Sequence, residues 1–199
     1  QSLVEGVSEW KYLHAAQGRD SHYELHSHNV GGSLKRQDFD IRLEGDGANF
    51  HLKSASFLSE SRHIDQQITL NHLGKNTKST QVINNVADNK ATATCNGRIV
   101  IDHGSSKADA SLSNKNLALG DNVTFNAKPE LEIYNDDVSC SHGATISQLS
   151  ESELFYLTSR GVHPARAKNM MARGFLNEAI SGALQEISTH RLESFFPKI

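Results

Sequence analysis

The sequence has 199 residues, a length that suits one large domain or one domain with a small appendage. Its 20 Lys and Arg stand against 23 Asp and Glu, and this net charge of −3 excludes the strongly basic surface of a typical nucleic-acid-binding protein. No apolar run is long enough for a transmembrane helix and no signal peptide is recognisable, so we expect neither a nucleic-acid nor a membrane partner.

The two cysteines, Cys95 and Cys140, are too few for a disulfide framework and indicate a reducing compartment. We therefore expect a cytoplasmic protein. The sequence begins at Gln1 without a methionine, which favours a piece of a longer protein. Hydrophobic residues make up 37% of the chain, a low share that favours many short strands around a narrow core.

Residues 1–32 have an ambiguous pattern that ends at Gly31-Gly32. From residue 33 to residue 142, apolar and polar residues alternate in about ten short runs, as is typical of half-buried strands. Phe39, Ile41 and Leu43 form one such run. An antiparallel sandwich and a parallel β-helix both fit this pattern, and no clear repeat decides between them.

The C-terminal part changes to helical spacing. Ser150 and Glu153 form a capping box, which predicts the start of a helix. Arg160-Gly161 predicts its end, and Pro164 suits the first position of a second helix. A third helix is expected over residues 183–194. The short connections predict an antiparallel helical hairpin.

Cys140 and His142 are the sharpest pair of candidate metal ligands. Residues two apart on a strand share a face, so a thiolate and an imidazole would lie side by side. This combination suits iron or zinc. Two ligands are too few for a closed four-ligand site, so either a partner completes the site or the pair is structural.

Other candidate ligands have simpler interpretations. Cys95 alternates with apolar residues and is predicted to be a core cysteine. His22, His26 and His28 lie close together in the sequence, and the last two would share a strand face. Ordinary surface histidines are the simpler interpretation of this group.

Common enzyme motifs are absent. The sequence has neither G-x-x-x-x-G-K-[ST] nor G-x-G-x-x-G, so no nucleotide is expected on this chain. The G-x-S-x-G motif of a serine nucleophile is also missing. A carbohydrate-processing β-helix enzyme would need clustered carboxylates, but the adjacent Asp136 and Asp137 would point to opposite faces of a strand.

Several long segments resemble a known family. They are Gly97-Arg-Ile-Val-Ile101, Lys107-Ala-Asp-Ala110, Asn114-Lys-Asn-Leu-Ala-Leu119, Lys128-Pro-Glu-Leu-Glu-Ile133, Asp136-Asp-Val-Ser-Cys-Ser-His-Gly-Ala-Thr145, Leu154-Phe-Tyr-Leu157 and Ser159-Arg-Gly161. The chain resembles the SufB/SufD family of iron–sulfur cluster assembly proteins, densely from about Asn71 to Ile180. Its Cys-Ser-His-Gly-Ala-Thr segment is similar to SufD rather than to SufB.

The resemblance implies a mainly β fold, with a right-handed parallel β-helix over residues 1–146 and a small C-terminal α-helical domain over residues 147–199. It further implies a non-enzymatic scaffold subunit of a SufBCD complex, in which the SufC ATPase drives cluster assembly. In this family the helical domain binds SufC, and SufB and SufD meet through their β-helices. The family's N-terminal helical region has little room before residue 33.

Site residues follow from the same resemblance. His142 matches the family's interface histidine and Cys140 lies in the same motif, so an iron–sulfur cluster would form there transiently, at the interface with SufB. The implied SufC contacts are Leu154, Phe155, Tyr156, Arg160, Gly161, Met170 and Phe175. The resemblance also allows a flavin in the complex. Without SufB, we expect the chain to form a homodimer through the exposed end of its β-helix.

The main alternative is a self-standing metal-binding or redox protein. It would use Cys140 and His142, and the histidines between residues 22 and 28 as further ligands.

Overall fold

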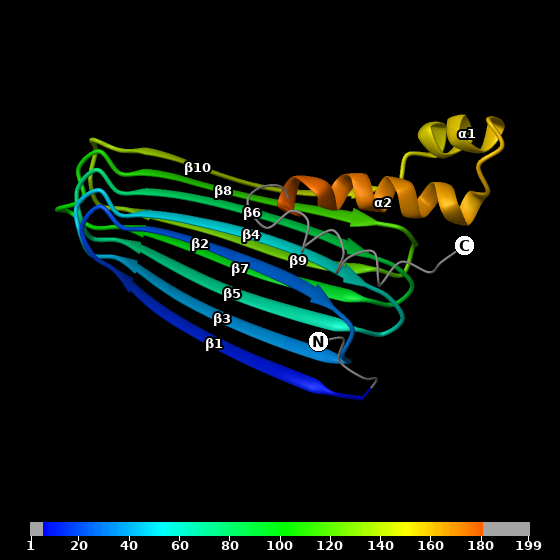
Figure 1. Cartoon of the computed structure of the whole chain (residues 1–199), viewed down its shortest axis with the longest axis horizontal. Helices are drawn as coiled ribbons and strands as arrows, with labels where there is room; N and C mark the ends of the chain where they lie inside the picture. The colour runs from blue at the N-terminus through cyan, green and yellow to red at the C-terminus, as the bar shows by residue number, and fades with distance from the viewer. Residues whose placement is uncertain (1–5, 181–199) are drawn as a thin grey trace.

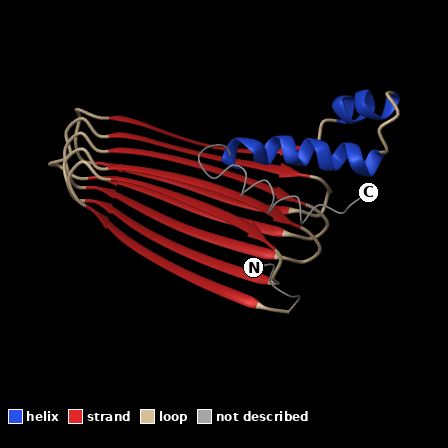
Figure 2. Ribbon diagram, in the orientation of Figure 1, coloured by secondary structure: helices blue, strands red, loops and turns tan. Residues whose placement is uncertain are grey.

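The computed structural model describes residues 6–180, which form ten strands and two helices (Figures 1 and 2). The strands are β1 (Ser8–Gln17), β2 (His22–Val30), β3 (Leu34–Leu43), β4 (Asn49–Leu58), β5 (His63–His72), β6 (Lys78–Ala87), β7 (Thr92–Ile101), β8 (Asp109–Ala118), β9 (Thr124–Ile133) and β10 (Ser139–Gln148). The helices are α1 (Glu151–Ser159) and α2 (Pro164–Ile180). No helix within residues 6–180 is long and apolar enough to cross a membrane.

The strands form two five-stranded sheets that face each other. One sheet has the order β1-β3-β5-β7-β9 and the other has the order β10-β8-β6-β4-β2. Every pair of neighbours is parallel, so each turn of the chain adds one strand to each sheet. This arrangement is a parallel β-helix, as the family resemblance implies, and it excludes the antiparallel sandwich.

The strand positions differ from the sequence-based expectation in three respects. Residues 34–148 contain eight strands, because several short apolar runs belong to one ten-residue strand. The runs before and after Ser54, for example, both lie in β4. Residues 8–30, whose pattern was ambiguous, contain β1 and β2. Asn-Gly is a common turn dipeptide, but Asn96-Gly97 lies inside β7 and not at a turn.

The coils of the β-helix differ in length, which explains why no repeat was visible. Along the first sheet, Ser8 pairs with Leu34, Leu34 with His63, His63 with Thr92, and Thr92 with Thr124. These partners lie 26, 29, 29 and 32 residues apart in the sequence. A fixed sequence period therefore does not exist, although the coils stack in register.

The core between the sheets has an apolar region and a polar one. Phe50, Leu70 and Ile99 belong to the apolar cluster. Elsewhere a column of buried polar side chains runs through the second sheet, with one residue from each of four successive strands. The column consists of Asn29, Ser56, Asn85 and Asn116. Its members hydrogen-bond along the stack, as from Asn85 Nδ2 to Asn116 Oδ1 at 2.9 Å.

The turns between the sheets also stack tightly. A Cβ atom at Gly45 would lie 2.0 Å from the backbone nitrogen of Arg19 in the previous coil. A Cβ at Gly74 would lie 2.6 Å from the backbone carbon of Gly45. Glycine is therefore required where these two turns contact the turn before them.

The two described helices match their predicted signals. Ser150 is the N-cap of α1 and accepts a hydrogen bond from the backbone N–H of Glu153 at 3.3 Å. Arg160 is the C-cap, and Gly161 follows with a φ of +86°. Pro164 opens α2. The third expected helix, over residues 183–194, lies outside the described residues.

Helix α2 covers part of the outer face of the second sheet, where it contacts β4 and β6 (Figure 1). Ala172, Leu176 and Ala179 pack there against Ala55 and Val86. Strand β6 is therefore buried on both faces over residues 84–87. Helix α1 lies entirely within the described range and has no buried residue.

Candidate functional site at the end of the β-helix

The last coil of the β-helix is formed by β9 and β10. Within residues 6–180, β9 pairs with β7 alone and β10 pairs with β8 alone, so both are edge strands. Pro129 lies in β9, and proline is tolerated in a strand when the strand is at an edge. Two neighbouring edges leave backbone N–H and C=O groups that a further strand could pair with.

Cys140 and His142 lie on β10, with their side chains on its core-facing side. Cys140 is in register with Ala110 and His142 with Leu112, and both partners are buried core residues of β8. The predicted shared face is therefore confirmed by the register. Cys140 is half-buried and packs against the apolar core cluster, whereas His142 is exposed. The end of the stack leaves both residues beside the open core.

The surroundings of Cys140 keep its thiol protonated at neutral pH. Burial raises the pKa of Cys140 above its usual value, and the nearby Asp109 carboxylate raises this pKa further. A hydrogen bond with the backbone of Ala110 acts in the opposite direction. Binding a metal ion through this sulfur would therefore have to displace a proton.

Apolar side chains border this end of the molecule. Ile146 follows His142 on the same face of β10 and is 60% exposed. Ile133, at the end of β9, is 44% exposed, and Tyr134 follows it. Together with Cys140 and His142, these residues form a partly apolar surface with one sulfur and one imidazole ligand, the composition expected of a contact surface between proteins.

The other cysteine belongs to the core, as predicted. Cys95 is buried on β7 in the apolar cluster. Burial raises the pKa of Cys95 to about 12, so its thiol is protonated and unreactive at neutral pH. Both cysteines are free.

The histidines of β2 are far from Cys140 in the fold. β2 and β10 are the two opposite edges of the second sheet. His26 contacts Glu24, with 2.9 Å between Nε2 and Oε1, and its ring lies 6.2 Å from that of His28. Among residues 6–180, no three His, Cys, Asp or Glu side chains are grouped so as to hold a metal ion. The histidines therefore do not join Cys140 and His142 in one site.

The residues expected to contact SufC fall into two groups. Phe155, Tyr156 and Met170 are 73%, 56% and 47% exposed. The guanidinium of Arg160 lies 4.6 Å from the centre of the Tyr156 ring. By contrast, Phe175 packs against the cluster between α2 and the second sheet, so its side chain has a structural role. Leu154 is half-buried, and Gly161 ends α1.

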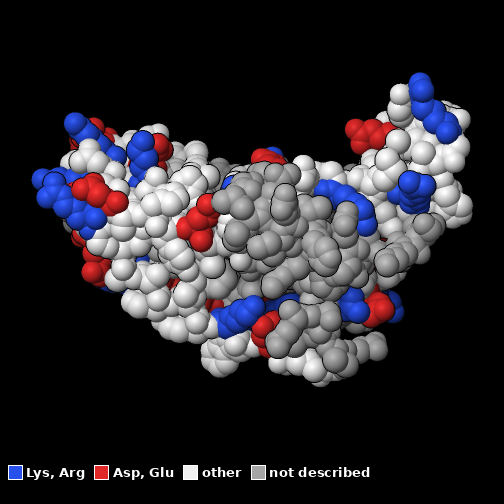
Figure 3. All heavy atoms as spheres, in the orientation of Figure 1, with Lys and Arg blue, Asp and Glu red and all other residues white. Residues whose placement is uncertain are grey.

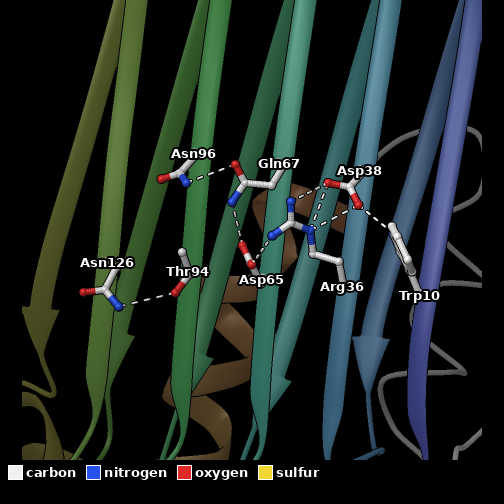
Figure 4. A network of polar contacts seen from close by, with 8 residues as sticks. All are labelled: Trp10, Arg36, Asp38, Asp65, Gln67, Thr94, Asn96 and Asn126. Carbon is white, nitrogen blue, oxygen red and sulfur yellow. Dashed lines mark hydrogen bonds and ion pairs between the residues drawn. The ribbon is translucent and has the colours of Figure 1, made fainter.

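The sequence did not reveal a network of polar contacts on the outer face of the first sheet (Figure 4). Arg36 bridges Asp38 on its own strand and Asp65 on β5, and Trp10 Nε1 donates to Asp38 at 2.6 Å. Gln67 continues the network towards β7. The only sign of this network in the sequence is the alternation of polar residues along the strands. Which of these residues contact one another is known only once the register of the strands is known. These side chains satisfy one another, so the network stabilises the sheet.

Charges of both signs are interspersed over the face in Figure 3, at the turn end of the β-helix and around the helices. This face has no large patch of a single sign among the described residues. The distribution agrees with the small net charge of the sequence.

A family model described as "SUF system FeS cluster assembly, SufBD core domain" matches residues 1–175. The chain belongs to the SufBD core-domain family. The match includes the whole β-helix together with α1 and the first part of α2.

Individual members of the SufBD family show the same relationship. "Iron-sulfur cluster assembly protein SufD" of Escherichia coli (strain K12) is 32% identical over 153 residues, which cover 77% of this chain and 36% of that protein. A SufBD family protein of Synechocystis is 32% identical over 167 residues, 83% of this chain and 36% of the relative. "Iron-sulfur cluster assembly protein SufB" of Bacillus subtilis is 32% identical over 151 residues, which cover 74% of this chain and 32% of that protein.

The expected similarity to SufD is confirmed, and SufB is similar as well. The alignments with these three relatives cover only 36%, 36% and 32% of their lengths. Membership in the family assigns the chain to the SUF system of iron–sulfur cluster assembly.

Proposed function

We propose that this chain is a scaffold subunit on which iron–sulfur clusters are assembled together with SufB, under the action of the SufC ATPase. The observation that carries the proposal is the position of Cys140 and His142. They share the core-facing side of an edge strand at the end of the β-helix. A thiolate and an imidazole are the ligand types that hold iron in proteins.

The number of ligands requires a partner. Iron in such clusters has four ligands, and among residues 6–180 this end of the β-helix offers two side chains of the right type, Cys140 and His142. We propose that SufB docks on the edge formed by β9 and β10 and supplies the remaining protein ligand, a cysteine. The cluster is cargo in this scheme and leaves for a carrier. Without SufB, the same edge would support a homodimer.

The proposed SufC contact is the exposed surface of Phe155, Tyr156, Arg160 and Met170. Exposed aromatic residues and arginine are the usual anchors of protein interfaces. In the proposed cycle, SufC dimerises on binding ATP and displaces the helices, and the displacement uncovers Cys140 beside the already exposed His142. We also propose a cytoplasmic location, which the small number of cysteines in the sequence favours.

A binding experiment tests the partners. Light scattering after size exclusion would give the mass of the chain mixed with SufC, with and without SufB. We expect a stable complex that weakens at least about tenfold in the Phe155→Ala/Tyr156→Ala variant, because aromatic anchors carry much of an interface's binding energy. Trp10→Ala, an exposed aromatic on β1, is the matched control and should bind normally. Failure of the folded chain to bind SufC would contradict the proposal.

A second experiment tests the site. Acid-labile sulfide would be measured on the complex after assembly with His142→Ala and Cys140→Ala. We expect cluster formation to be lost while the complex remains intact. Ser141→Ala is the matched control, because Ser141 lies between the two residues on the opposite face of β10. A full cluster yield from the His142→Ala complex would exclude the proposed site.

A further inference from the structure

Strand β10 joins the candidate site directly to the helices. It ends at Gln148, and α1 begins at Glu151, so only Leu149 and Ser150 separate them. Leu149 packs against the cluster beneath α2, and its N–H donates to Ala118 O at 3.1 Å. The strand that carries Cys140 and His142 is therefore the strand on which a displacement of α1 acts first.

One buried residue of the neighbouring strand holds the α1 end of β10. Asn116 Nδ2 donates to the backbone carbonyl of Thr145 at 3.1 Å, and Ser147 Oγ donates to the backbone carbonyl of Asn116 at 3.2 Å. Asn116 is the last member of the polar column in the core. Both contacts lie between Cys140 and α1 along β10.

The remaining contacts of Asn116 fix its side chain. Its Oδ1 accepts a hydrogen bond from Asn85 at 2.9 Å, and its Nδ2 also contacts Asn114 Oδ1 at 3.1 Å. If β10 moved away, the buried amide would lose its bond to Thr145. A buried polar group that loses a partner costs more than an exposed one. The side chain of Asn116, which lies on β8, therefore favours the state in which β10 stays packed against β8.

We propose that Asn116 is a positioning residue that fastens β10, and that loss of this fastening opens the edge strand and exposes the Cys140 thiol. The inference rests on the proposed function, in which Cys140 must be uncovered for cluster assembly. Its test measures the exposure of Cys140 directly and needs no partner. The fastening role of Asn116 can therefore fail while the proposed function stands, and the proposed function can fail while the fastening role stands.

The experiment is a pulse of iodoacetamide on the full chain, followed by mass spectrometry of the peptides that contain Cys140 and Cys95. In Asn116→Ala, we expect Cys140 to be alkylated about tenfold faster, because the side-chain hydrogen bond from residue 116 to Thr145 no longer opposes local opening. Cys95 should stay protected in both proteins. Hydrogen exchange should also become faster in β10 and not in β4.

Two further variants separate local opening from general loss of stability. Asn29→Ala removes a buried amide from the same column in the first coil, far from β10, and should leave the alkylation of Cys140 unchanged. Ser147→Ala removes only the part-buried hydrogen bond to the backbone carbonyl of Asn116 and should accelerate alkylation about threefold. This variant provides the test if Asn116→Ala does not fold. Equal acceleration in the Asn116 and Asn29 variants, or none in folded Asn116→Ala or Ser147→Ala, would overturn the proposal.

Discussion

Asn84 Nδ2 donates a hydrogen bond to the backbone carbonyl of Phe175 at 2.7 Å, and this contact joins β6 to α2 across 91 residues of sequence. Asn84 is fully buried under the helix. Nearby, Lys115 and Glu178 form an ion pair at 2.7 Å, in which the side chains are 39% and 53% exposed. Helix α2 is thus held to the sheet by this buried hydrogen bond, by the contacts of Glu178 with Lys115 and Asn84, and by the apolar cluster.

The two polar contacts of α2 should differ in strength. Asn84→Ala should lower the free energy of unfolding by about 1–2 kcal/mol, because it removes a buried hydrogen bond between β6 and α2. Lys115→Met should change it by about 0.5 kcal/mol or less, because exposed ion pairs contribute little. Urea denaturation checks both values. A larger loss in Lys115→Met than in Asn84→Ala would contradict this account.

The reactivity of Cys140 should depend on Asp109. The Asp109 carboxylate helps to raise the pKa of Cys140, so Asp109→Asn should lower this pKa and increase the thiolate fraction at pH 8. The alkylation rate of Cys140 as a function of pH should therefore shift to lower pH. Asp121→Asn, on an exposed turn at the opposite end of the strands, is the control and should leave the profile unchanged. An unshifted profile in Asp109→Asn would show that burial alone sets the pKa.

Acid should destabilise the fold through His72. Burial lowers the pKa of His72 to about 4, and its Nδ1 and Nε2 contact the hydroxyls of Thr77 and Ser79 at 2.8 and 2.9 Å. Because the unfolded chain binds this proton more readily, stability should be complete above about pH 6.5 and decline as the pH falls towards 4. The decline should be on the order of 3 kcal/mol.

His72→Gln should remove this decline, because the glutamine side chain does not titrate. The control is His103→Gln, since His103 is exposed, and it should keep the decline. Urea denaturation at several pH values between 4 and 7 measures the slopes. Parallel slopes in the wild-type chain and His72→Gln would assign the acid sensitivity to other groups.

The stacked turns should distinguish two glycines. Gly45→Ala should cost about 2 kcal/mol or more, because the new methyl group would overlap the backbone of Arg19. Gly104→Ala should be neutral or slightly stabilising, since a Cβ there meets no atom within 4 Å. Melting temperatures of the two variants provide the comparison. Equal melting temperatures would mean that the turns can separate without cost.

Much of the candidate site could be predicted because local rules decide it. A spacing of two places Cys140 and His142 on one strand face, and the resemblance named the same two residues. The cap at Ser150 and the start of α2 at Pro164 follow from equally local rules. These predictions do not depend on which strands are neighbours.

Features that depend on neighbouring coils could not be predicted. Strand β2 was ambiguous because its core-facing side includes Ser27 and Asn29, which are buried in the polar part of the core. Gly97 resembled a turn residue, but it lies inside β7. Glycine suits this position because a Cβ there would come within 2.3 Å of Leu112 Cδ1. The contact of Asn116 with Thr145 likewise becomes visible only when the pairing of β8 with β10 is known.

The polar column in the core has a consequence for how the chain avoids misfolding. In a purely aliphatic β-helix, a strand could slide by two residues along its neighbour and still direct the same kind of side chain inwards. Here such a slide would move Asn85 away from Asn116 and bury an amide against aliphatic side chains. The polar column therefore favours the native register of the strands. A coil in a shifted register would lose these buried hydrogen bonds before the next coil forms on it.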